Sequence, residues 1–215
     1  MDISKLIILV KKDILVEVRR RYEVLSTLAF ISAAALLIGE ISTQYLDFSI
    51  GDVSIWVIMI FIAIFMSTST FIREADKKTI YGVRLIPISP SLVFIAKLLY
   101  TFIFVSLESL FYILLIYLFT SKSTYLDLET FIVFIVVSLN ISAVSAFSSA
   151  LSMYSEGRSL LIPMLIFIFT IPIIPVAVRI AGEDYIGGLM DYIFLIGETL
   201  SFIATSTILS TYLLE

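Results

Sequence analysis

Residues 53–71 read VSIWVIMIFIAIFMSTSTF, nineteen consecutive positions without a charged side chain. About 20 apolar residues, each rising about 1.5 Å along a helix, are needed to cross the roughly 30 Å hydrocarbon layer of a bilayer. Lipid offers no hydrogen-bond partners to a polypeptide backbone, so a segment of this kind is expected to be helical. The stretch therefore predicts a transmembrane helix and makes the chain an integral membrane protein.

Apolar stretches of similar length recur along the 215 residues, which are 60% apolar and have a mean hydropathy of +1.10. We predict an all-α, polytopic membrane protein with a single transmembrane domain over residues 1–215, because the runs lack the alternation of barrel strands. The six predicted spans are Glu23–Glu40, Val53–Ile72, Leu98–Phe119, Leu128–Met153, Leu160–Ile180 and Tyr192–Leu214. They leave no room for a separate soluble catalytic domain.

Lysine and arginine are distributed unequally between the two ends of these spans. Twelve of the 14 lie before the first span or in the second and fourth connections, whereas Lys122 and Arg179 lie on the other side. Cytoplasmic loops carry the excess of positive charge in membrane proteins. We therefore predict a multi-pass protein of the cell membrane with both termini in the cytoplasm.

The composition excludes several kinds of chemistry. The sequence contains no cysteine and no histidine, which removes disulfides, thiolate metal sites and the commonest ligand of haem iron and other metals. The nucleotide-binding motif Gly-x-x-x-x-Gly-Lys-[Ser/Thr] is absent as well. We expect no catalytic residue, cofactor, metal or nucleic-acid partner in this chain. An intramembrane enzyme is disfavoured, because no pairing of nucleophile and base is visible.

An amphipathic helix is predicted over residues 1–21, before the first span. Its apolar stripe recurs at helical spacing and is formed by Ile3, Ile7, Val10, Ile14 and Val18. Such a helix rests in the plane of the membrane interface, with its cations at the lipid headgroups. The expected interfacial anchors are Arg19, Arg20 and Arg21. The helix is either a topology anchor alone or an elbow that moves with the bundle.

The connection between spans two and three, residues 73–91, is dense in charge. Its beginning, Arg73–Tyr81, predicts a short amphipathic helix on the cytoplasmic surface. Pro87 and Pro90 cannot continue a helix and predict a rigid turn before the third span. A helix in this position suits the transmission of force from a soluble partner. The alternative is a solvated connector that obeys the positive-inside rule.

Motifs in this connection resemble those of a known family. Residues 73–79 read READKKT, residues 85–87 read LIP, and Ala96-Lys97 leads into the third span. Their order and spacing resemble the cytoplasmic region of type-2 ABC exporter permeases, and are most similar to the CcmB-type haem exporter subunit of cytochrome c maturation. The basic opening segment and the prolines of the fifth span are also similar to that family. Lys78 departs from it, since the family usually has glycine there, and so does Tyr81, where it often has glutamate.

The resemblance implies the permease subunit of an ABC exporter, CcmB-like and active in haem export, that couples ATP hydrolysis in a separate ABC-type ATPase subunit to export. It also implies a homodimer, or a pair with a second membrane subunit, in the lipid bilayer. The implied ATPase-coupling residues are Arg73, Glu74, Asp76, Lys77, Lys78, Thr79, Arg84 and Pro87. The alternatives are a non-transporting scaffold of a cytochrome-assembly complex and an exporter of a lipid, drug or polysaccharide.

Polar residues inside the spans are further candidates. A carboxylate at the bilayer centre costs about 2.5–3.5 kcal/mol on insertion scales, so it usually faces a cavity or a partner. We expect Glu108, Tyr112 and Glu198 to line a translocation path, with helix packing or snorkelling as the alternative. Serines recur on one face of the fourth span, which predicts close packing between helices.

Prolines distinguish the fifth span. Pro172 and Pro175 each remove a backbone hydrogen bond and should break the helix near the outer leaflet. Broken helices in membranes usually border a cavity. We therefore predict a broken span followed by an outer loop over residues 160–191, with a gate in this region.

Overall fold

The protein is a bundle of helices, seen in a computed structural model that describes residues 3–44, 50–85, 88–120, 128–181 and 188–214. The described residues contain no strand, in agreement with the predicted all-α fold. In chain order, the elements are α1 (Ile3–Arg19), α2 (Arg21–Gln44), α3 (Ile50–Ser67), η1 (Thr68–Ile72), α4 (Arg73–Asp76), α5 (Ile80–Arg84), α6 (Pro90–Thr120), α7 (Leu128–Ser152), α8 (Arg158–Thr170), α9 (Ile174–Ile180) and α10 (Leu189–Leu214). Here η1 is a five-residue π-helical segment that continues α3 into α4.

Five helical segments of the described chain are long and apolar enough to cross a membrane. They lie in α2, in α3 with its continuation through η1 and α4, in α6, in α7 and in α10. The bent pair α8 and α9 makes a sixth span if the two are counted as one. The chain is thus a multi-pass membrane protein, and each predicted span has a helical counterpart.

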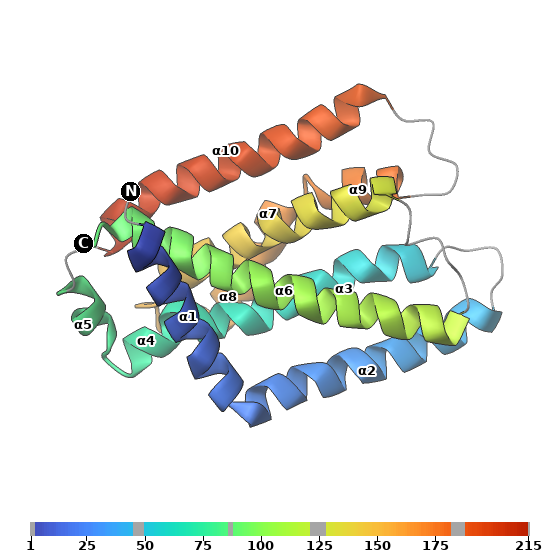
Figure 1. The fold of residues 1–215 in the computed structure, drawn as a ribbon. Helices are drawn as coiled ribbons and strands as arrows, with labels where there is room; N and C mark the ends of the chain where they lie inside the picture. The colour runs from blue at the N-terminus through green and yellow to red at the C-terminus, as the bar shows by residue number, and fades with distance from the viewer. Residues whose placement is uncertain (1–2, 45–49, 86–87, 121–127, 182–187, 215) are drawn as a thin grey trace.

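Helices α6 and α7 form the centre of the bundle, with α3 beside them. α7 packs against α3, α6, α8 and α10, and α6 also packs against α1, α2 and α3. Buried residues make up 67% of the most apolar window of α3 and of α7, but 17% in α2 and 22% in α10. These two outer helices run along opposite sides of the bundle, as lipid-facing helices do (Figure 1). Both chain ends lie at the end of the bundle that carries α4 and α5.

The third predicted span is wrong at its beginning. Helix α6 starts at Pro90 instead of Leu98 and therefore includes Lys97, whose side chain is buried. Pro90 occupies the first helical position, where its missing N–H has no intrahelical partner to lose. The carbonyl of Ser89 accepts the N–H of Leu92 at 3.0 Å and starts the helix. The predicted apolar run begins only after Lys97. The helix nevertheless begins seven residues before Lys97, at Pro90, because the charge of Lys97 is paired inside the protein.

The helices of the fifth predicted span are bent where the prolines predict a break. Helices α8 and α9 are bent by 50° across residues 171–173, and Pro172 lies in this break. Its ring clashes with the carbonyl four residues earlier and it donates no backbone hydrogen bond, which ends α8. Pro175 lies in the first turn of α9, where proline is tolerated. The described helices are bent at this point, whereas a broken span with an outer gate stays a prediction, and residues 182–187 lie outside the described part of the chain.

A serine of α7 is inserted into the backbone of the π-helical segment. The hydroxyl of Ser149 accepts the N–H of Phe71 at 3.0 Å and donates to the carbonyl of Ser67 at 2.6 Å. In a regular α-helix these two backbone groups would bond to each other, since they are four residues apart. Ser149 therefore bridges the opened ladder and satisfies the N–H of Phe71, whereas the carbonyl of Ser67 also accepts from the hydroxyl of Thr70 at 2.8 Å. Ser145, one turn earlier, donates to the carbonyl of Ala63 at 2.8 Å.

Replacing Ser149 by alanine should destabilise the fold. The change leaves a buried N–H and a buried carbonyl without this partner, so we expect the free energy of unfolding to fall by about 1–3 kcal/mol. Ser142→Ala is the matched control, because Ser142 is equally buried but donates to Ser138 of its own helix. Thermal unfolding in detergent measures both variants. Equal effects of the two substitutions would contradict the bridging role.

Candidate functional site

Eight charged side chains gather where α1, α2, α4 and α6 meet, at the end of the bundle that holds both chain ends (Figure 1). We name this cluster the charge network. Its members are Lys12, Asp13, Glu17, Arg20, Glu23, Arg73, Glu74 and Lys97. A cavity of about 310 Å³ lies among them. The network thus ties together segments that are far apart in the sequence.

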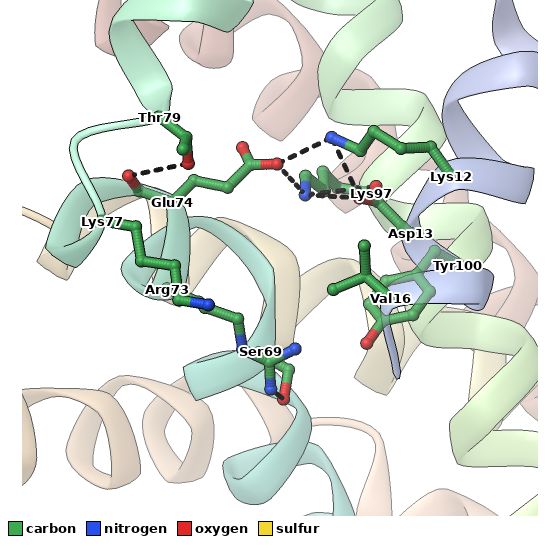
Figure 2. A pocket seen from close by; sticks show the side chains of 10 residues that line it. All are labelled: Lys12, Asp13, Val16, Ser69, Arg73, Glu74, Lys77, Thr79, Lys97 and Tyr100. Carbon is green, nitrogen blue, oxygen red and sulfur yellow. Dashed lines mark hydrogen bonds and ion pairs between the residues drawn. The ribbon is translucent and has the colours of Figure 1, made fainter. Parts of the chain in front are cut away.

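Two lysines and two carboxylates form one half of the charge network (Figure 2). The Nζ atom of Lys97 lies 3.1 Å from Asp13 and 2.9 Å from Oε1 of Glu74. Lys12 contacts the same two carboxylates, at 3.2 Å and 2.9 Å. The ammonium group of Lys97 also lies 5.8 Å from the centre of the Phe71 ring, within reach of a cation–π interaction. Because Lys97 is 3% exposed, this half lies inside the protein rather than on its surface.

Arg73 organises the other half of the charge network. Its guanidinium contacts Glu17 at 2.6 Å and also contacts Glu23, so it joins α1 to α2. Glu17 accepts further hydrogen bonds from the hydroxyl of Tyr100 at 2.8 Å and from that of Ser69 at 3.3 Å. These donors come from α6 and η1. A single carboxylate of α1 is therefore held by three other segments.

The charges of the network balance. Arg20 completes it by contacting Glu23 at 2.6 Å, so that four cations face four carboxylates. Desolvating a charge costs several kcal/mol, and pairing is what compensates this cost. Burial opposes the charge on Lys12, but the carboxylates of Glu74 and Asp13 outweigh it and raise the pKa of Lys12 above its ordinary value. The network is therefore neutral as a whole.

Helix α4 ends in a Schellman motif centred on Lys78. The N–H of Thr79 donates to the carbonyl of Glu74 at 2.9 Å, and that of Lys78 donates to the carbonyl of Ala75 at 3.0 Å. Lys78 has a φ of 57°, in the left-handed region that glycine usually fills. A side chain in this conformation costs about 1–2 kcal/mol. The family that this loop resembles usually has glycine here, and glycine adopts this left-handed conformation without strain.

The predicted coupling residues fall into two groups. Arg73 and Glu74 point into the protein and pair with residues of α1, α2 and α6, so their charges are engaged within this chain. Asp76, Lys77, Lys78 and Thr79 are exposed. The side chain of Arg84 and the whole of Pro87 lie outside the described part of the chain. A coupling role for these residues stays a prediction.

Helix α1 turns part of its apolar stripe outward. Ile3, Ile7 and Val18 are exposed, whereas Val10 and Ile14 pack against the core, and Asp13 and Glu17 are buried against α6. The exposed part of the stripe is free to contact lipid, as in an interfacial helix. Hydropathy does not single out Asp13 or Glu17. The signal for them is their spacing of four residues on a face beside the stripe.

The three predicted interfacial anchors differ in their contacts. Arg19 and Arg21 are exposed. Arg20, at the junction of α1 and α2, is paired with Glu23 inside the charge network. Arg19 and Arg21 therefore stay candidates for contact with lipid headgroups, and Arg20 has a structural partner instead.

The three residues predicted to line a translocation path make separate contacts. Glu108 of α6 lies 3.1 Å from the hydroxyl of Thr27 in α2. Tyr112, one turn later, is fully buried and donates to Ser54 of α3 at 2.8 Å. Glu198 of α10 accepts a hydrogen bond from α7 at 3.0 Å. The single chain does not bring them together, and a shared path stays a prediction.

Comparison with known proteins gives one family match. Residues 20–169 match the sequence model of a family described as ABC-2 family transporter protein. The matched region covers more than two thirds of the 215 residues and includes α2 to α7. No curated protein and no solved structure matches the chain.

Removing the buried lysine tests whether the charge network holds these helices together. Lys97→Met leaves Asp13 and Glu74 with one cation fewer, so we expect the free energy of unfolding to fall by about 3–5 kcal/mol. Lys77→Met is the control, because Lys77 is exposed on the neighbouring turn; its effect should stay within about 0.5 kcal/mol. Unfolding in detergent measures both. A similar, small change in the two variants would show that the network contributes little to the fold.

Proposed function

Because the chain belongs to the ABC-2 family of transporter proteins, we propose that it is the permease subunit of an ATP-driven exporter that works with a separate ABC-type ATPase. The observation that supports a coupling role is the charge network, which joins the segment after α3 to α1, α2 and α6. Hydrolysis takes place in the partner. This chain converts the movement of the partner into a rearrangement of membrane helices.

The exposed turn after α4 is the surface offered to the ATPase. Asp76, Lys77 and Lys78 give it charges of both signs. Tyr81 and Leu85 are 58% and 85% exposed, and add apolar area next to these charges. A small apolar centre with a charged rim is typical of a protein–protein interface. The rim charges govern register and association rate more than affinity.

Arg73 and Glu74 carry movement of this turn into the membrane domain. Glu74 contacts α1 and α6, and Arg73 contacts α1 and α2. A displacement of α4 would therefore act on three helices at once, whereas a connector without such contacts would absorb it. In this arrangement α1 is an elbow that moves with the bundle.

The assignment of a cargo, an oligomeric state and a cellular membrane rests on the resemblance to CcmB-type haem exporters. It favours haem export in cytochrome c maturation by a homodimer, or by a pair with a second membrane subunit, in the cell membrane. The alternative is a scaffold that moves no cargo, and transport assays in vesicles distinguish the two. The sequence has no histidine, so this chain would not ligate haem in the usual way. The chain thus offers no feature of its own that selects haem.

Reversing the exposed charges should weaken the association with the ATPase. The pair of changes Lys77→Glu and Lys78→Glu reverses two exposed cations. It leaves the charge network in place, as well as the ion pair that Asp76 makes with Arg158 at 2.7 Å. We expect the association rate to fall about tenfold at low salt, and ATPase stimulation to fall with it. The control is Glu129→Lys, an exposed residue in the first turn of α7, a helix that begins at the opposite end of the bundle (Figure 1). Unchanged co-purification and unchanged ATP hydrolysis in the double variant would refute this coupling surface.

The absence of cysteine allows the orientation to be tested with single cysteines. Lys78→Cys should resist a membrane-impermeant maleimide in intact cells and react after permeabilisation, because the basic side is placed in the cytoplasm. Glu129→Cys should react from outside. Labelling of Lys78→Cys in intact cells would reverse the proposed orientation.

A further inference from the structure

A second cavity lies between the start of α2, η1 and α6. Its volume is about 120 Å³, and three carboxylates line it, those of Glu17, Glu23 and Glu108. We name it the glutamate pocket. Ser69 lines both this pocket and the larger cavity, so the pocket adjoins the charge network.

The hydroxyl groups around the glutamate pocket direct their hydrogens to groups of the protein. Ser26 and Thr68 each donate to a backbone carbonyl of their own segment at 2.7 Å, and Thr27 shares its hydrogen between the carbonyl of Val24 at 2.9 Å and Oε1 of Glu108 at 3.1 Å. Ser69 donates to Glu17 at 3.3 Å. What these side chains leave for a ligand is oxygen lone pairs. The lining therefore suits a ligand that brings its own N–H donors.

Glu108 is the carboxylate that the charge network does not neutralise. The network pairs its four cations with four other carboxylates. Glu108 is 6% exposed, and its Oε1 lies 3.1 Å from the hydroxyl of Thr27. Its Oε2 is buried and has no hydrogen-bond partner among the described residues. A buried carboxylate of this kind is neutral when it holds a proton. Its ionised form is stabilised by a cation that enters the pocket in place of that proton.

The size and the donor set of the pocket select the kind of cation. A volume of about 120 Å³ is that of about four water molecules, or of an amino head group. The described residues contain no group of three side chains that could hold a metal ion. A primary ammonium group carries three N–H donors and matches a lining of acceptors.

An exposed aromatic surface continues from the pocket. Phe65 lines the pocket, and its ring centre lies 5.7 Å from that of Phe30. Phe61 lies 5.9 Å from the same ring. The three side chains are 36% to 42% exposed and belong to α2 and α3. Because α2 is an outer helix, this surface faces lipid and can hold an apolar chain.

We propose that the glutamate pocket binds the primary ammonium group of an amphiphile whose apolar chain lies against Phe30, Phe61 and Phe65. As a cargo site, the pocket rests on the proposed exporter function and narrows its cargo to an amine-bearing lipid or drug. Haem carries carboxylates and no ammonium group, so this cargo departs from the haem assignment that the resemblance favours and corresponds to the alternative of a lipid or drug exporter. The ammonium group belongs either to a membrane lipid such as phosphatidylethanolamine or to a soluble long-chain amine.

The test measures binding of dodecylammonium to the full chain in phosphatidylcholine nanodiscs, because the headgroup of that lipid has no N–H donor. Binding should be saturable, and dodecanol should not compete. Glu108→Gln can still accept from Thr27 but removes the charge, so the affinity should fall about tenfold to a hundredfold. Glu156→Gln makes the same change at an exposed position after α7 and should leave the affinity unchanged. Equal affinity of Glu108→Gln and the unaltered chain, or competition by dodecanol, would overturn the proposal.

A second variant keeps the test independent of the folding of Glu108→Gln. Phe65→Ala removes part of the apolar wall with Glu108 intact, and should weaken dodecylammonium about tenfold; an unchanged affinity would refute the aromatic surface. The assay contains neither ATPase nor nucleotide. Its failure would therefore refute the pocket alone, whereas failed association with an ATPase would refute the exporter function and leave the binding result standing.

The source of the ammonium group is found by adding phosphatidylethanolamine to the nanodiscs. Competition with dodecylammonium assigns the glutamate pocket to a lipid headgroup. Undiminished binding of dodecylammonium assigns it to a soluble amine, and either result supports recognition of a primary ammonium group.

Discussion

The ion pairs of Arg73 and Glu74 are the interaction on which the rest of this structure depends. These neighbouring residues at the start of α4 contact charges of α1, α2 and α6. Buried ion pairs rarely add stability, because desolvation offsets the Coulomb attraction. What a balanced set of charges supplies instead is a specific arrangement, since displacing one member leaves another uncompensated. The cluster therefore has few alternative packings and favours concerted movement, which is what a point of force transmission needs.

Backbone features on both sides fix the position of Arg73 and Glu74. Before them, Ser149 of α7 holds the π-helical segment open by bonding to both ends of one interrupted helical turn. After them, the left-handed conformation of Lys78 ends α4 and reverses the chain. An α-helix turns by about 100° per residue, so closing the π-helical segment would rotate both charged side chains away from their partners. The central helix α7 thus controls the register of the charge network without contributing a charge to it.

Much of the fold follows from the sequence because a bilayer permits few structures. Apolar runs predict the spans, and Pro172 predicts the break between α8 and α9. The start of α6 does not follow, because Lys97 ends the apolar run and its pairing with carboxylates is a property of the folded chain. The same holds for Glu74, since a short helix in a loop does not reveal which face meets the protein. Glu108 and Glu198 are each a single glutamate within an apolar span, so the sequence does not distinguish them. Their partners lie on different helices, and the spacing of residues along one helix carries no information about the contacts of that helix with its neighbours.

The charge network and the glutamate pocket share two carboxylates, and this links them energetically. Arg73 contacts both Glu17 and Glu23. A displacement of α4 that separated Arg73 from them would remove one positive charge from beside the pocket. Glu23 would keep its contact with Arg20, so one negative charge would be left unbalanced and would strengthen the attraction for a cation. Thermodynamic linkage is reciprocal. If displacement of Arg73 strengthens the binding of a cation, then binding of a cation in the pocket must favour the displaced position of Arg73. At an effective dielectric constant of about 20, a unit charge about 4 Å away contributes about 4 kcal/mol. Even a partial displacement would therefore change the affinity for an ammonium group manyfold, which is the size of effect that coupling between cargo and ATPase requires.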